Sequence, residues 1–117
     1  MLNQVVLVGR LTANPEVVVL EGGKKKTTVN LAVSRSFKNT DGIYETDFIR
    51  CVLWDGIAAN TSEYCKKGDV VGVKGRIQTS SYEKDGETKY SFDVIAEKVT
   101  FLTSKKEETI TEEADNE

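Results

Sequence analysis

The fold is decided by two adjoining stretches, YETDFIRCVLW at residues 44–54 and DGIAANTSEYCKKG at residues 55–68. Apolar residues in the first stretch recur at every second position, which is the pattern of a half-buried strand. In the second stretch, Asp55 can cap a short helix over residues 56–66, and Gly68 follows as a natural C-terminal stop. The two stretches therefore predict a strand that is followed at once by a short helix.

The rest of the body shows the same period of two, which predicts a protein built from strands. The further strands are expected at residues 2–12, 27–37, 69–82 and 87–102, with a short apolar run at 17–21. Five main strands with one short helix between strands 3 and 4 match an all-β OB-fold, a partly open Greek-key barrel. Pattern alone does not separate this fold from other small β-barrels. Gly72 and Gly75 favour it, because a barrel strand can bend sharply at glycine.

Composition limits the classes of function that the chain can have. Its 117 residues suit one domain, and its longest apolar runs are far shorter than a membrane span. It has no histidine and no recognisable nucleophile or two-metal constellation, so we expect no enzyme, no metal site and no cofactor. Cys51 and Cys65 are expected as inert, partly buried thiols. The first residues lack the pattern of a secretory signal, so a cytoplasmic location is expected.

Charge is distributed unevenly along the chain. Residues 103–117 contain two lysines and six acidic residues, a net charge of −4, whereas residues 1–102 have a net charge of +1. A segment with so few apolar residues cannot bury enough surface to offset the entropy lost on ordering. We expect a folded domain over residues 1–102 and a disordered acidic tail over residues 103–117.

Aromatic and basic residues gather on the sides of two strands that face away from the predicted core. The inward positions are Ile49, Cys51 and Leu53 in the third strand and Val71, Val73 and Ile77 in the fourth. The opposite sides carry Tyr44, Thr46, Phe48, Arg50, Val52 and Trp54, and Lys74, Arg76, Gln78, Ser80 and Tyr82. Alternate residues of a strand are about 6.5–7 Å apart, close to the reach between splayed bases. Because rings stack on any base and cations follow phosphates, the pattern predicts sequence-tolerant binding of a single-stranded nucleic acid.

Other aromatic and basic residues leave alternatives open. Phe37 fits the same surface only if its strand bends or leaves the barrel near Ser34. Tyr90 and Phe92 are expected mainly as core or packing residues, with Tyr90 the more exposed of the two. The lysines at 24–26 form either a solvated loop tip or a phosphate contact. Exposed rings would also suit an alternative function, a protein-interaction adaptor such as a primosome component.

Five blocks of sequence occur in a distinctive order along residues 1–102. They are MLNQVVLVGRL (1–11), NPE (14–16), TDFIRCVLW (46–54), KKGDVV (66–71) and GRIQT (75–79). Together they resemble the bacterial and phage single-stranded DNA-binding proteins, the SSB family, whose mechanism is base stacking on an OB-fold. The resemblance implies a homotetramer that binds single-stranded DNA and protects it during replication, recombination and repair.

The resemblance also implies which residues contact DNA. The family's four stacking positions fall on Phe37, Phe48, Trp54 and Tyr82. Positions similar to its backbone contacts are Arg10, Arg35, Lys38, Arg50, Lys66, Lys67, Lys74, Arg76 and Lys89. Residues 112–117, EEADNE, are acidic but lack the apolar anchor with which cellular members dock replication and repair partners. In this respect the chain resembles phage-encoded or accessory members.

Overall fold

A computed structural model describes residues 1–103, and the predicted tail, Thr103 apart, lies outside the described residues. The elements are β1 (Val5–Leu11), β2 (Val18–Val19), β3 (Lys25–Lys38), β4 (Tyr44–Trp54), α1 (Asp55–Tyr64), β5 (Val70–Lys84) and β6 (Glu87–Phe101). All five main strands are present, and the helix follows the third of them, β4, as predicted. The apolar run at 17–21 contributes the two-residue β2.

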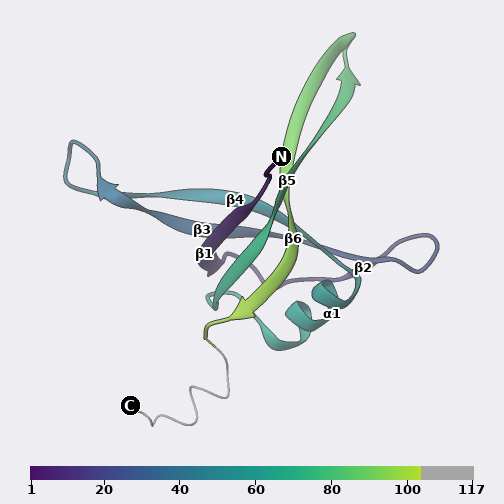
Figure 1. Ribbon diagram of the computed structural model, residues 1–117, viewed down its shortest axis with the longest axis horizontal. Helices are drawn as coiled ribbons and strands as arrows, with labels where there is room; N and C mark the ends of the chain where they lie inside the picture. The colour runs from purple at the N-terminus through teal and green to yellow at the C-terminus, as the bar shows by residue number, and fades with distance from the viewer. Residues whose placement is uncertain (104–117) are drawn as a thin grey trace.

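The strands form one sheet that closes on itself. Its order is β1–β5–β6–β4–β3–β2, and β1 also pairs with β3 through Arg10↔Ala32 and Leu11↔Leu31. Only β4 and β6 pair in parallel; the other pairs of these described strands are antiparallel. The α1 helix lies against β3, β4 and β6 (Figure 1). This arrangement is the OB-fold barrel predicted from the order of elements.

The core lies where the inner faces of the barrel strands meet one side of α1. Leu31, Cys51, Leu53 and Val71 are buried there, and the alternation along β1, β3 and β4 agrees with the period of two. Cys51 and Cys65 are free, buried thiols, as predicted. Burial raises the pKa of each thiol to about 11, so both stay protonated and unreactive at neutral pH.

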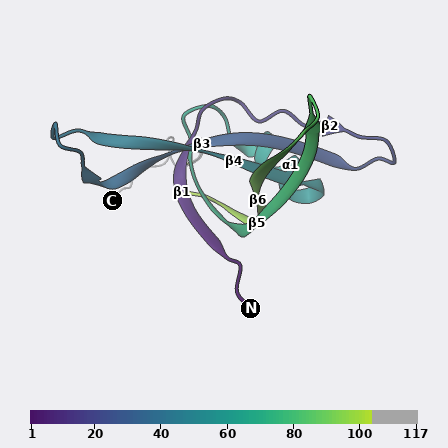
Figure 2. The same ribbon diagram turned by 90° about the horizontal axis from the view of Figure 1, so that it is seen from above.

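Two long hairpins extend beyond the barrel in different directions (Figures 1 and 2). We call residues 34–46 the β3–β4 arm and residues 78–93 the β5–β6 arm. Asp85 and Gly86 both have positive φ, as a tight two-residue hairpin turn requires. Gly42 also has positive φ, +77°, in the loop of the other arm.

The arms explain where the predicted burial is wrong. Ile77 is predicted to point inward but is 41% exposed, because pairing of β1 with β5 extends only to Gly75 and β5 then leaves the barrel. Tyr90 and Phe92, predicted as core or packing residues, lie on the β5–β6 arm and are 79% and 69% exposed. Val52 lies on the outer side, as predicted, but it is buried there between Thr28 of β3 and Ile95 of β6, its register partners on that face.

The start of α1 also differs from the prediction. Asp55 does not cap the helix; it is the first helical residue, with φ +50°. Its carboxylate Oδ1 accepts a hydrogen bond from the backbone N–H of Lys25 at 3.1 Å. The helix ends at Tyr64, two residues before the predicted end. Asp55 therefore ties the loop before β3 to the end of β4.

The register between β5 and β6 shifts where this pair of strands passes from the barrel into the arm, because Glu97 of β6 has no partner in β5. The shift lies between Lys74 and Gly75, and a Cβ placed on Gly75 would collide with the backbone carbonyl of Ile95. The close approach of the two strands therefore requires glycine at this position.

We expect Gly75→Ala to lower the free energy of unfolding by about 1–3 kcal/mol, because the added methyl group must displace backbone atoms. Gly72→Ala is the matched control in the same strand, since the nearest atoms to its Cβ would be 3.8 Å away. Urea unfolding followed by circular dichroism measures both. Equal stability of the two variants would contradict the close approach at Gly75.

Candidate nucleic-acid interface

Four strands share one continuous outer face. Thr28, Val52, Ile95 and Arg76 lie side by side across β3, β4, β6 and β5, because each is the register partner of the next. Register partners project to the same side of a sheet, and side chains alternate along each strand. The outer face of these strands therefore also includes Lys26, Asn30, Phe48, Arg50, Trp54, Gln78, Ser80, Tyr82, Lys89 and Asp93.

The four predicted stacking residues lie at different places on the molecule. Phe48 and Trp54 belong to β4 and flank Arg50; the Phe48 side chain is 69% exposed and Trp54 is half-buried. Tyr82 is exposed on the outer side of the β5–β6 arm. Phe37 is exposed on the β3–β4 arm, beyond an irregularity in the register of β3, so the predicted bend is present. The structure thus places two of the rings on one strand, six residues apart, and the other two on separate arms.

Four of the nine basic residues predicted to contact DNA are paired with carboxylates of the same chain. Arg35 contacts Asp47 at 2.9 Å and Glu45 at 2.8 Å. The other pairs are Arg50 with Asp93 at 3.1 Å, Arg76 with Glu97 at 3.8 Å, and Lys89 with Glu87 at 3.0 Å. The hydrogen bond between Arg35 and Asp47 lowers the pKa of the carboxyl and raises that of the guanidinium. Exposed pairs of this kind are weak, so a phosphate can replace the carboxylate.

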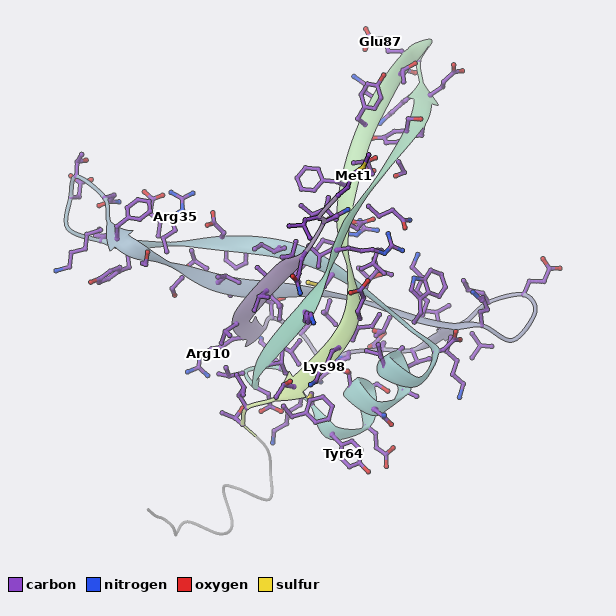
Figure 3. All side chains as sticks on the ribbon, in the orientation of Figure 1. Met1, Arg10, Arg35, Tyr64, Glu87 and Lys98 are labelled. Carbon is purple, nitrogen blue, oxygen red and sulfur yellow. The ribbon has the colours of Figure 1, made fainter. Side chains whose placement is uncertain are left out.

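Three predicted basic residues lie near the end of β1. Arg10 Nη1 donates a hydrogen bond to the carbonyl of Gly68 at 2.9 Å. Lys66 and Lys67 belong to the same loop, between α1 and β5. Figure 3 shows Arg10 at this end of β1 and Arg35 on the β3–β4 arm. Arg10, Lys66 and Lys67 thus form a basic region at the end of β1 and in the loop before β5.

The last two predicted basic residues lie on different strands. Lys38 is on the β3–β4 arm, with Nζ 5.6 Å from the ring centroid of Tyr44. Lys74 is exposed on β5 and pairs in register with Lys98 of β6. The predicted cations therefore occupy several regions of the surface and do not form a single patch.

Two lysines beside Trp54 are functional candidates that the sequence left undecided. Lys24 Nζ lies 5.4 Å, and Lys26 Nζ 5.5 Å, from the centroid of the Trp54 ring. Lys26 is also the register partner of Trp54 across β3 and β4. The register between β3 and β4 could have predicted that Lys26 lies beside Trp54. That register depends on how many extra residues the irregularity in β3 contains.

Phe92 is a residue whose exposure the period of two did not predict. With Asp47, Phe48, Ile49, Arg50 and Val94, it lines a groove of about 420 Å³ between β4 and β6. An aromatic side chain predicted mainly as core or packing therefore borders the surface that carries Phe48.

Within residues 1–103, no group of three or more potential metal-ligating side chains is found. Over the same residues, no helix has the length and apolar character needed to cross a bilayer.

Comparison with known proteins agrees with the fold and shows the family. Residues 2–102 match the Single-strand binding protein family. The chain is 49% identical over 109 residues to single-stranded DNA-binding protein B of Bacillus subtilis (strain 168), which covers 92% of this chain and 96% of that protein. It is also 49% identical over 106 residues to single-stranded DNA-binding protein 3 of Listeria innocua, covering 90% of this chain and 66% of that protein.

A solved structure extends the comparison to three dimensions. A deletion mutant of the single-stranded DNA binding protein from Thermus aquaticus matches with a TM-score of 0.74 at 34% identity, over 87% of this chain and 51% of that chain. The chain spans about half the length of that solved protein. A barrel of this topology with rings and cations on its outer face defines an OB-fold protein of the oligonucleotide-binding class. Within that class, the chain belongs to the single-strand binding protein family.

We expect Asp93→Asn to strengthen binding of poly(dT), because a phosphate no longer has to displace the Asp93 carboxylate from Arg50. The slope of log affinity against log salt should stay within a few tenths of the wild-type slope, because Arg50 contacts a phosphate in both proteins. Asp41→Asn, in the loop of the β3–β4 arm, is the control of equal charge. A gain no larger than that of the control would argue against a phosphate contact by Arg50.

Proposed function

We propose that the chain binds single-stranded DNA with little sequence preference. Bases stack on four exposed or half-exposed rings, and phosphates contact lysine and arginine side chains. The stacking residues are Phe37, Phe48, Trp54 and Tyr82. The phosphate contacts are Arg10, Arg35, Lys38, Arg50, Lys66, Lys67, Lys74, Arg76 and Lys89. The observation that supports this proposal most directly is the outer face of β4, on which Phe48, Arg50 and Trp54 alternate with residues that face the core.

Stacking supplies the part of the affinity that does not depend on sequence. Every base has a π-face, and each stack on an aromatic side chain is worth about 1–3 kcal/mol. Phe48 and Trp54 are held on a strand whose backbone is paired with β3 and, from Cys51 onward, with β6. Because the backbone is already ordered, little entropy is lost there when a base is bound.

The cations supply the part of the affinity that depends on salt. Arg35 and Arg50 are held on the surface by carboxylates, and a phosphate can exchange for those carboxylates at small cost. Neutralising phosphates releases condensed counterions, so binding weakens as the salt concentration rises. This combination suits a stoichiometric protein that covers single strands in replication, recombination and repair, in the cytoplasm of a bacterial or phage-infected cell.

Assembly into a homotetramer is part of the proposal. The outward side of β1 carries Val6 and Val8, both more than half exposed, and Leu2 precedes them. Apolar side chains gathered in this way favour contact with another copy of the chain. Several linked barrels also raise the affinity for one long strand, because each further contact becomes intramolecular.

Light scattering of the full chain should give four times the mass of one subunit. Val8→Lys should shift the population toward smaller species, because it places a charge on the exposed apolar side of β1. Thr88→Lys, at an exposed position of the β5–β6 arm, is the control and should leave the mass unchanged. A monomeric wild-type chain at micromolar concentration would refute the tetramer.

Phe48→Ala and Tyr82→Ala should each weaken binding of a labelled oligo(dT) by about 1–3 kcal/mol, or about 5- to 150-fold in dissociation constant. Tyr90→Ala is the matched control, because Tyr90 lies on the opposite side of the same arm from Tyr82. Fluorescence anisotropy measures all three. Equal losses for Tyr82→Ala and Tyr90→Ala would contradict the assignment of the outer face.

Trp54 is the chain's one tryptophan, so its emission reports on binding directly. We expect poly(dT) to quench it, with an affinity that falls as salt rises. No quenching and no anisotropy change at low salt would reject DNA binding. No contact among the described residues favours the alternative of a protein-interaction adaptor.

A further inference from the structure

The loop that enters β3 places two positive charges on the ring of Trp54. The Nζ atoms of Lys24 and Lys26 lie 5.4 and 5.5 Å from the ring centroid. These distances are within the range of a cation–π contact. The lysines therefore lie at one of the four positions where a base is expected to stack.

Hydrogen bonds hold this loop in place. The backbone N–H of Leu20 donates to the carbonyl of Lys24 at 2.7 Å, and that of Gly23 donates to the carbonyl of Leu20 at 2.9 Å. The Asp55 carboxylate accepts the backbone N–H of Lys25 at 3.1 Å, which links the loop to the residue after Trp54. Two of these bonds hold the loop together internally, and the third joins it to the residue that follows β4.

The charges of these two lysines are not neutralised within the described part of the chain. Among residues 1–103, Lys24 and Lys26 take part in no ion pair, whereas Arg50 and Arg76 on the same face are paired with Asp93 and Glu97. A phosphate that approaches Trp54 therefore meets two cations without first displacing a carboxylate. This corner of the outer face combines an aromatic ring with unpaired positive charge.

We propose that Lys24 and Lys26 form a phosphate clamp at Trp54, in which their ammonium groups bind the phosphodiester groups that flank the base stacked on the ring. This inference rests on the proposed binding of single-stranded DNA and adds two residues to it. In the free protein the ammonium groups lie over the ring. A base stack is stronger than an exposed cation–π contact, so the base displaces them toward the adjacent phosphates.

The clamp predicts a specific salt dependence. Two phosphate contacts contribute about 1.4 to the slope of log affinity against log salt, at about 0.7 for each contact on a single strand. The double variant Lys24→Met and Lys26→Met should therefore flatten the slope for poly(dT) by about 1.4. Methionine keeps an unbranched side chain of similar length and removes only the charge.

A second double variant controls for the loss of net charge. Lys25→Met and Lys105→Met remove two positive charges from residues outside the proposed contacts. Lys25 starts β3 on the side opposite Lys26, and Lys105 belongs to the acidic segment 103–117, outside the described residues. The control should keep the wild-type slope to within a few tenths. Equal slopes in the two double variants would overturn the clamp while leaving DNA binding intact. A wild-type chain that does not bind poly(dT) would overturn both the clamp and the proposed binding of single-stranded DNA.

Iodide quenching of Trp54 tests the geometry without DNA. Ammonium groups raise the local concentration of an anion, so iodide should quench wild type and the control more strongly than the variant with Lys24→Met and Lys26→Met. Replacement of both residues by arginine should restore the quenching and the salt slope. Equal iodide quenching in the two methionine variants, or no recovery with arginine, would overturn the clamp.

Discussion

The pairing of β4 is the constraint on which the rest of the structure depends. This strand pairs with β3 along its length and with β6 near Cys51 and Val52, so neither its register nor its orientation is free. One side buries Cys51 and Leu53 in the barrel. Because side chains alternate, the same pairing forces Phe48, Arg50 and Trp54 to the other side. Burial of the core therefore also sets the spacing of the rings that remain at the surface.

The two arms extend this outer face beyond the barrel. They carry Phe37 and Tyr82 beyond the barrel on two different arms, so a bound strand would pass over the barrel and along the arms rather than enter a pocket (Figure 1). Intramolecular carboxylates hold several of the arginines on this surface, while the lysines at Trp54 are held by the loop backbone. The charges around the rings can therefore exchange partners when a phosphate approaches.

Much of this architecture could be predicted from the sequence, because local periodicity and turn residues determine it. The five main strands, the helix after β4, the buried cysteines and the exposed Phe48 all follow from alternation along single segments. The exposure of Tyr90 and Phe92 does not follow, because it depends on where β5 and β6 leave the barrel. The ion pairs and the position of the lysines beside Trp54 depend on the register between neighbouring strands. The sequence of a single segment does not determine that register.

Photocrosslinking tests the central claim most directly. An oligonucleotide that contains 5-iododeoxyuridine, irradiated with the full chain and mapped by peptide mass spectrometry, identifies the rings in contact with bases. We expect adducts on Phe48 and Trp54 of β4, on the outer side of the barrel. Adducts confined to Tyr64 and Tyr90, with none on β4, would contradict the assignment of this face to single-stranded DNA.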